Sequence, residues 1–183
     1  MEEELLIEFK QNAIFRLEEG QRMLHLAFAK VGEDSLWKLP VKNGMALGNQ
    51  LLHVRGNMTQ YVLASLGQEA DQRQRDSEFS TTKGYSKAEL LQQLDATVSR
   101  AIKTIQTTSP SEYLRVRKVQ GFEFSGVGVV LHAVEHFSYH VGQVAFWVKQ
   151  LTEADLGFYD HHDLTQINDW YADQTHHSLF RHQ

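Results

Sequence analysis

The sequence contains no cysteine and only two prolines in 183 residues. Without cysteine the chain can form no disulfide, offers no thiolate to a metal and has no thiol nucleophile, so any metal must be held by histidine, carboxylate or amide groups. Pro40 and Pro110 both fall between helical patterns, which leaves the long periodic segments free of helix breakers. The scarcity of proline therefore favours a mainly α-helical protein.

The chain also lacks a basic surface, a long apolar run and a recognisable linker. Its formal net charge is −5 with both signs interspersed, which argues against nucleic acid as a partner. The start, Met1 to Glu4, is acidic, and no apolar run approaches the roughly 20 residues that span a bilayer, so we expect a soluble, cytoplasmic protein with no membrane partner. Without a Pro/Gly/Ser-rich linker or an internal repeat, residues 1–183 are expected to form one domain.

What the sequence does contain is four long segments in which apolar residues recur at three- and four-residue steps. These segments run from about residue 4 to 31, 46 to 66, 86 to 107 and 126 to 153. Ser86 and Glu89 form a capping-box pattern at the start of the third segment. Four helices with longer connections predict a four-helix bundle, an architecture whose core commonly holds metal sites.

The connections between these segments differ in composition. Trp37 is expected to anchor the first connection, and residues 67–85 are polar and charged, as is typical of a surface loop. In residues 108–124, the apolar Leu114 and Val116 alternate with Arg115 and Arg117, which indicates an extended stretch.

The most informative segment runs from Leu131 to Gln143, because three histidines recur in it at four-residue intervals within a helical, mostly apolar run. Four residues are close to one helical turn, so His136 and His140 point the same way and could bind one divalent metal. On a helical wheel both lie at the margin of the apolar face, whereas His132 is displaced by about 40° toward the polar side. His132 could therefore support a ligand, line an entrance or be solvated.

A third ligand would have to come from another helix. In the second predicted helix, His53, Asn57 and Gln60 form a polar line separate from the apolar stripe. Three histidine ligands would leave a coordination position open for water or substrate, as in catalytic metal sites. The alternative is that these histidines are packing residues satisfied by neighbouring side chains, and the spacing alone does not decide between the two.

The same residues carry a family resemblance. The segment Tyr139-His140-Val141-Gly142-Gln143, together with His53 in Leu51-Leu52-His53-Val54-Arg55-Gly56-Asn57, resembles the DinB-like superfamily, and in particular a bacterial branch with a Tyr-His-x-Gly-Gln signature. The resemblance covers about residues 1–160 and leaves 161–183 as a C-terminal extension. It implies an all-α four-helix bundle, commonly a homodimer, in which His53, His136 and His140 bind a divalent metal such as zinc or nickel.

Three neighbours of these ligands are candidates for supporting roles. Asn57, one turn after His53, could orient that imidazole, because a metal-bound histidine usually gives its other N–H to an acceptor. Gln143 could donate to a metal-bound oxygen, or could serve packing alone. Gly142 is expected to let another helix approach closely, at some cost in helix propensity.

Two chemistries are open to such a site. A metal-activated water could hydrolyse an ester or amide, or the metal could hold a small thiol as thiolate and direct it at an electrophile. The resemblance supports thiol transfer, because several relatives use low-molecular-weight thiols, and either reaction implies a small-molecule substrate. The third alternative is a non-catalytic metal-binding or stress-response bundle, which a fourth protein ligand such as Asp160 or His161 would indicate.

The tail beyond Leu156 is rich in histidine, aspartate and aromatic residues. Residues 167–172 are expected to form a short helix. The aromatic side chains of Trp170 and Tyr171 are expected to pack on the body of the protein or on a dimer partner.

Overall fold

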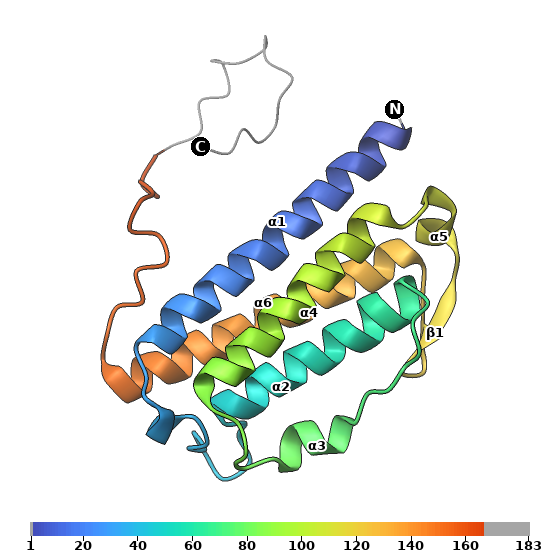
Figure 1. The fold of residues 1–183 in the computed structure, drawn as a ribbon. Coiled ribbons are helices and arrows are strands. Elements are labelled where there is room, and N and C mark those ends of the chain that lie inside the picture. The colour runs from blue at the N-terminus through green and yellow to red at the C-terminus, as the bar shows by residue number, and fades with distance from the viewer. Residues whose placement is uncertain (1, 167–183) are drawn as a thin grey trace.

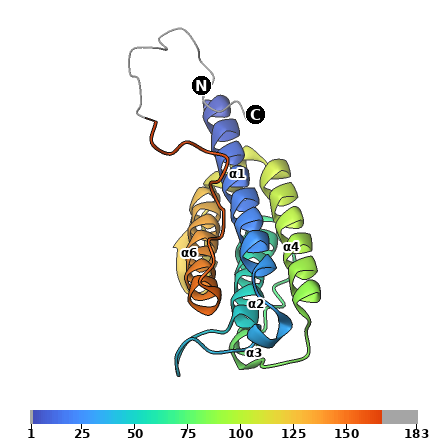
Figure 2. The same ribbon diagram turned by 90° about the vertical axis from the view of Figure 1, so that its left-hand side faces the viewer.

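A computed structural model describes residues 2–166 of the chain. Within these residues, four long helices lie side by side (Figures 1 and 2): α1 (Glu2–Ala29), α2 (Leu47–Met58), α4 (Lys87–Thr107) and α6 (Gly126–Thr152). A π-helical segment, η2 (Thr59–Leu66), continues α2 without a break. The predicted all-α four-helix bundle is therefore confirmed.

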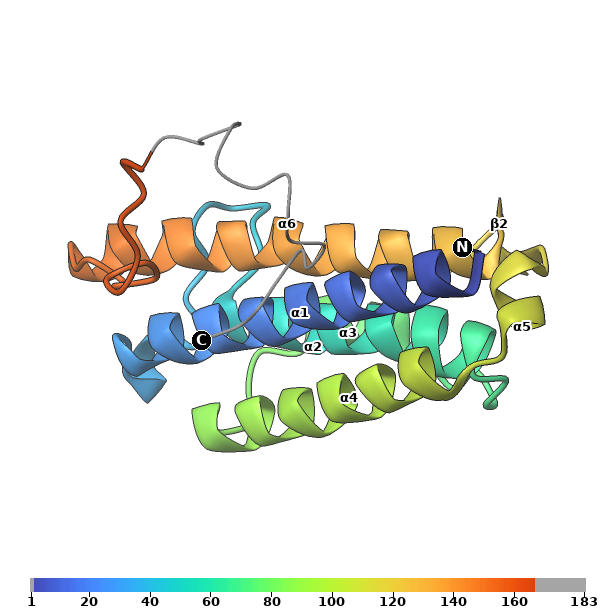
Figure 3. The same cartoon turned by 90° about the horizontal axis from the view of Figure 1, so that it is seen from above.

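The direction of the helices explains the longest connection. Helices α1 and α6 run one way and α2 and α4 the other (Figures 1 and 3), so the chain must return along the bundle between α2 and α4. Residues 67–86 make that return and contain a short helix, α3 (Arg75–Ser80), which the polar composition of this connection did not predict. Helix α3 packs against α2.

Local sequence explains where the helices begin and end. Ser86 caps α4: its hydroxyl accepts from the backbone N–H of Glu89, whose carboxylate accepts from the backbone N–H of Ser86 at 2.8 Å. Ser125 caps α6 by accepting from the N–H of Gly128 at 3.2 Å. Helix α6 ends at Thr152, and Glu153, which caps it, adopts a left-handed φ of 54°. The predicted capping box is thus confirmed.

Aliphatic and aromatic side chains form the core between the four long helices. Helix α1 packs on α6 and α4, and α2 packs on the same two helices. The contact between α1 and α6 is tight at Gly20, where an added Cβ would lie 2.8 Å from the ring of Phe137. The expectation that Gly142 provides such a close approach is wrong, because a Cβ there would meet no heavy atom within 4 Å.

The connection before α6 holds α5 (Pro110–Leu114) and an antiparallel pair of strands, β1 (Arg117–Val119) and β2 (Phe122–Phe124). The predicted extended stretch is present in part, as the two strands, because Leu114 belongs to α5. Burial in this segment departs from the expected alternation at three positions. Leu114 and Val116 are 77% and 62% exposed, whereas Arg117 is 8% exposed. The guanidinium of Arg117 donates to the carbonyl of Ser65 at 3.1 Å. Burial of Arg117 therefore satisfies a carbonyl in the last turn of η2.

The connection between α1 and α2 contains a short 3₁₀ turn, η1 (Glu33–Ser35). Trp37 follows it and anchors the connection as predicted: the ring is half-buried against Gly48, where an added Cβ would lie 2.6 Å from the indole. Glycine at this position allows the indole to reach the backbone of α2.

After α6 the chain turns back toward α1, where Arg22 donates to the carbonyl of Phe158 at 2.7 Å. The helix predicted for residues 167–172 and its aromatic side chains lie outside the described residues. Among the helices of residues 2–166, none is both long enough and apolar enough to cross a membrane.

Candidate metal centre

Three histidines converge from two helices. His53 lies in α2, and His136 and His140 lie on successive turns of α6. One ring nitrogen of each histidine lies within 4.8 Å of the corresponding nitrogens of the other two. His53 and His140 are 7% and 6% exposed, and His136 is half-buried. The structure thus brings together the three residues that the sequence nominated as ligands.

The spacing of the rings suits a single divalent ion. Nε2 of His136 and Nε2 of His53 are 3.1 Å apart. Two imidazole nitrogens bound to one tetrahedral zinc ion, at the usual zinc–nitrogen distance, lie roughly 3.3 Å apart. The ring centroids of the three histidines are 4.5–4.9 Å apart in pairs. Because imidazole suits zinc, nickel and neighbouring divalent ions, the cluster could hold such a metal.

A buried ion pair holds the imidazole of His53. Its Nδ1 lies 2.8 Å from Oε2 of Glu78, which belongs to α3. An ionised carboxylate only accepts hydrogen bonds, so Nδ1 carries a proton, and in the neutral ring Nε2 then keeps its lone pair. Arg73 donates from Nε to Oε1 of Glu78 at 2.7 Å and from Nη2 to Oε2 at 2.8 Å. A carboxylate behind a histidine is the arrangement that commonly orients a metal-bound imidazole.

An amide chain holds the imidazole of His140. Gln50 of α2 donates from Nε2 to Oε1 of Gln143 at 2.8 Å, so its own Oε1 is directed at Nδ1 of His140, with which it is hydrogen-bonded. The amide oxygen accepts from Nδ1–H, which again leaves Nε2 unprotonated. Gln143, which could donate to a metal-bound oxygen or serve packing alone, accepts from Gln50 in this structure.

Burial keeps two of the imidazoles neutral. Burial, together with repulsion from His140 and His53, lowers the pKa of His136 to about 3. Burial and repulsion from His53 lower the pKa of His140 to about 4. Burial raises the pKa of Glu78, but hydrogen bonds from Arg73 and His53 outweigh it and hold this carboxyl below its usual range. At neutral pH, His136 and His140 are therefore in the unprotonated form that metals bind.

The group among residues 2–166 that could hold a metal has three members, and no fourth histidine or carboxylate joins it. Asp160 and His161, the candidates for a closing ligand, are exposed. Their segment is tied to α1 through the hydrogen bond from Arg22 to Phe158. A metal held by three residues keeps a coordination position open.

Comparison with known proteins identifies the family of this chain. A family model described as "Protein of unknown function (DUF1572)" matches residues 5–159. The chain belongs to the DUF1572 family. None of the curated proteins matches it.

Solved structures share the fold of this DUF1572 chain. The DinB-like protein YjoA of Bacillus subtilis is 13% identical, with a TM-score of 0.61 over 79% of this chain and 94% of that one. A DinB-like protein of Bacillus cereus is also 13% identical, with a TM-score of 0.62 over 81% of this chain and 93% of that one. These likenesses confirm the DinB-like fold that the histidine motifs predicted.

Two further residues that the sequence nominated, Asn57 and His132, contact each other in this DUF1572 protein. Nδ2 of Asn57 lies 3.4 Å from Nε2 of His132. Asn57 is a candidate for orienting His53, but the carboxylate that lies at Nδ1 of His53 is that of Glu78. His132 is half-buried and stacks on Tyr61 with ring centroids 4.1 Å apart, and its centroid is 5.9 Å from that of His136. His132 therefore lies beside the three ligands without joining them.

Sequence reasoning missed three residues of the site: Gln50, Arg73 and Glu78. Gln50 precedes His53 by three residues and so shares its face of α2, a signal that the sequence does contain. Arg73 and Glu78 lie in the returning connection, and no local periodicity shows which part of that connection meets α2. Only the packing of α3 on α2 reveals them.

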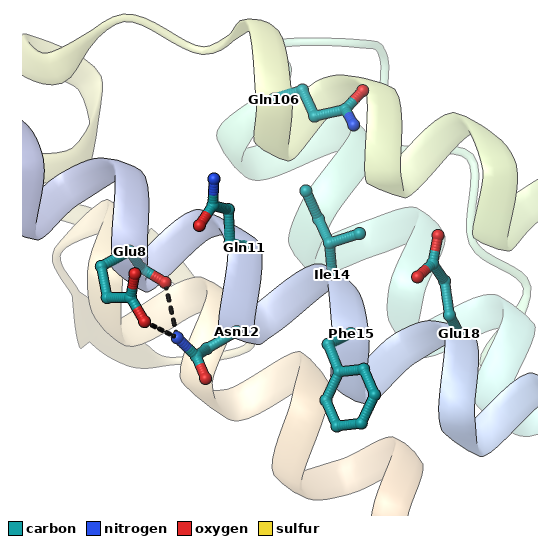
Figure 4. Close-up of a pocket in the computed structure, with 7 residues that line it drawn as sticks. All are labelled: Glu8, Gln11, Asn12, Ile14, Phe15, Glu18 and Gln106. Carbon is teal, nitrogen blue, oxygen red and sulfur yellow. Dashed lines mark hydrogen bonds between the residues drawn. The ribbon is translucent and has the colours of Figure 1, made fainter. Parts of the chain in front are cut away.

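A separate pocket of about 340 Å³ lies between α1 and α4 (Figure 4). Glu8, Glu18 and Gln106 are among the residues that line it, and Asn12 donates to the carboxylate of Glu8 at 2.9 Å. None of the three clustered histidines lines this pocket. It is therefore distinct from the candidate metal centre.

Proposed function

We propose that this DUF1572 protein binds a divalent metal through His53, His136 and His140 and transfers a small thiol to a small-molecule electrophile. The observation that supports a catalytic site is the convergence of three imidazoles without a fourth protein ligand among residues 2–166. Zinc and nickel are the metals that we propose, because both accept imidazole nitrogen.

Each group of the site has a task in this proposal. When bound, a divalent ion with three neutral ligands keeps its full charge and lowers the pKa of a thiol or a water at the open position. The three imidazoles hold the ion, while Glu78 and Gln50 keep two of them in the tautomer with a free Nε2. The half-buried ring of His136 marks the side from which a small molecule would enter.

The engagement of Glu78 favours a thiol over a water nucleophile. Attack by water gains from a general base within hydrogen-bond reach, whereas a coordinated thiol loses its proton outright. Glu78 is the carboxylate that contacts His53, and both of its oxygens accept from Arg73. It is therefore not free to take a proton. Because the chain has no cysteine, the thiol must come from a small molecule.

Hydrolysis is the second candidate, and the position of His132 favours it. This histidine lies one turn before His136 on α6. Its Nε2 has a long contact with Nδ2 of Asn57, at 3.4 Å, which a small molecule could displace. If a small molecule reached that nitrogen, His132 could serve as the acid or base that hydrolysis needs.

The first experiment is metal analysis by inductively coupled plasma mass spectrometry on untagged protein that has not met a chelator. Near one metal per chain is expected in the wild type, with near-complete loss in His53→Ala and in His136→Ala. His25→Ala is the matched control, because His25 is an exposed residue of α1 paired with Asp95. A wild-type protein that takes up neither zinc nor nickel would overturn the proposal.

The second experiment separates the three alternatives. Cobalt-substituted protein is mixed with glutathione or free cysteine, and a sulfur-to-cobalt charge-transfer band is expected in the near ultraviolet. Turnover is then assayed with a panel of electrophiles in the presence of thiol and with a panel of esters and amides in its absence. Ester or amide cleavage without a thiol band would establish hydrolysis instead, and bound metal without either activity would leave a non-catalytic bundle.

A further inference from the structure

We propose that Glu78, clamped by Arg73, is the positioning residue that sets the tautomer of His53 and thereby the affinity of the site for metal. This inference rests on the metal site proposed above and concerns a helix, α3, that lies outside the four-helix bundle. Neither residue is a ligand. Both act through His53.

The three side chains form a buried row. His53, Glu78 and Arg73 are 9%, 8% and 2% exposed as side chains. The carboxylate lies 2.8 Å from Nδ1 of His53 and accepts two hydrogen bonds from one guanidinium. Nη2 of Arg73 also lies 3.4 Å from Nδ1, but this longer contact is the weaker competitor for that nitrogen. The short carboxylate contact therefore decides where the ring proton lies.

The position of the carboxylate is secured by its surroundings. Gly56 of α2 faces Glu78, and a Cβ there would lie 1.9 Å from Oε1, so only glycine leaves room for the carboxylate against the helix. Asn49 of α2 donates from Nδ2 to the backbone carbonyls of Glu78 and Thr81 at 2.9 and 2.8 Å. The clamp on Glu78 extends through Arg73, whose Nη1 donates to Gln60 at 3.0 Å.

A carboxylate suits this position because it forms hydrogen bonds in one direction only. A carboxylate accepts but never donates, so it is compatible only with the Nδ1–H form of His53. A glutamine can present either its oxygen or its amide group, and so tolerates both tautomers. A metal requires the Nδ1–H form, because its ligand nitrogen must be Nε2. Groups that hold metal-bound histidines this way commonly contribute 10- to 100-fold to metal affinity.

The test compares Glu78→Gln and the double variant Arg73→Met/Glu78→Gln with the wild type. The double variant removes the buried arginine charge that Glu78→Gln leaves unpaired, and so controls for simple destabilisation. Glu112→Gln is the matched control, because Glu112 pairs with a buried arginine, Arg117, that contacts none of the histidines. Zinc affinity is measured by competition with a chromogenic chelator, and the His53 tautomer by long-range ¹H–¹⁵N NMR on chelator-treated protein.

We expect zinc binding to weaken roughly 10- to 100-fold in both Glu78 variants and to stay within threefold of wild type in Glu112→Gln. In the wild type, His53 should be found as the Nδ1–H form alone, and in both Glu78 variants as a mixture. A double variant that binds zinc within threefold of wild type, or a tautomer that does not change, would overturn the inference. Failure of the metal site itself is distinguishable, because the wild type would then bind no zinc while the NMR result still reports on Glu78.

Discussion

At the scale of single residues, the ligands differ in the group behind each ring. A carboxylate stands behind His53 and an amide oxygen behind His140. Both groups engage Nδ1, and the negative charge of Glu78 makes the hydrogen bond behind His53 a charge-assisted one. The burial of His136 and His140 lowers the stability of the metal-free protein at acidic pH, because these two rings resist protonation in the folded state.

Metal-free protein should therefore lose stability as the pH is lowered. The folded-state pKa values of His136 and His140 are about 3 and about 4, below the ordinary value of 6.5. Between about pH 6.5 and pH 4 the unfolded chain binds protons at these positions and the folded chain does not. The free energy of unfolding therefore decreases as the pH is lowered through that window. Urea denaturation of chelator-treated protein at a series of pH values measures this dependence.

The double variant His136→Gln/His140→Gln isolates the effect. It should show a smaller change in the free energy of unfolding across the same pH window, since other titrating groups are unaltered. Identical pH dependence in variant and wild type would contradict the assignment.

At the scale of elements, α2 presents residues of the site to two of its neighbours, α6 and α3. Gln50 and His53 meet residues of α6, whereas Asn49 and Gly56 receive α3. The metal centre thus depends on a helix that lies in a connection. Any change that lifts α3 from α2 should disturb the site without touching a ligand.

Two glycine-to-alanine changes test this arrangement. Gly56→Ala should lower the free energy of unfolding by about 1–3 kcal/mol and weaken zinc binding, because the new Cβ would overlap the carboxylate of Glu78. Gly142→Ala is the matched change on α6: with no heavy atom within 4 Å of the added Cβ, it should raise the free energy of unfolding by up to about 1 kcal/mol. Urea denaturation and zinc competition measure both effects, and equal behaviour of the two variants would refute the packing argument.

At the scale of the whole molecule, a metal at this site would join α2 to α6. Along the chain, these helices are separated by two long connections and by α4. An ion bound to both in the folded state alone stabilises that state by mass action.

Adding zinc to metal-free protein should therefore raise its Tm. At a free zinc concentration a hundredfold above Kd the gain is about 2.7 kcal/mol. For a chain of this size that corresponds to roughly 5–10 °C. Differential scanning calorimetry measures the shift, and His53→Ala should show little of it. A shift of equal size in His53→Ala would mean that zinc acts elsewhere.

We propose that the assembly in solution is a homodimer, as the resemblance to the DinB-like superfamily implies. Helix α6 supports this with apolar side chains open to solvent: Leu131, Tyr139 and Phe146 are 55%, 63% and 67% exposed. Phe146→Glu should shift the protein toward monomer in sedimentation velocity. Leu114→Glu, at a 77% exposed position in α5, is the control that should leave the dimer intact. A wild type that sediments as monomer would rule the dimer out.

The sequence alone determined the four long helices and the alignment of His136 with His140. Both are local properties: apolar periodicity and the Ser86–Glu89 pattern specify where helices lie, and a four-residue spacing specifies a shared face whatever the helix packs against. The polar line in the second helix indicated His53 by the same reasoning. Local rules of this kind do not depend on the path of the chain between helices.

Only the tertiary structure decided which groups hydrogen-bond to those ligands and which side chains are buried. Glu78 and Arg73 reach His53 because the connection returns along α2, and Arg117 is buried because a carbonyl in the last turn of η2 needs a donor. Gly142 faces open space, and the close approach falls at Gly20 instead. Each of these outcomes depends on contacts between residues far apart in sequence, whose geometry is set by how helices pack together and leaves no periodic trace in the chain.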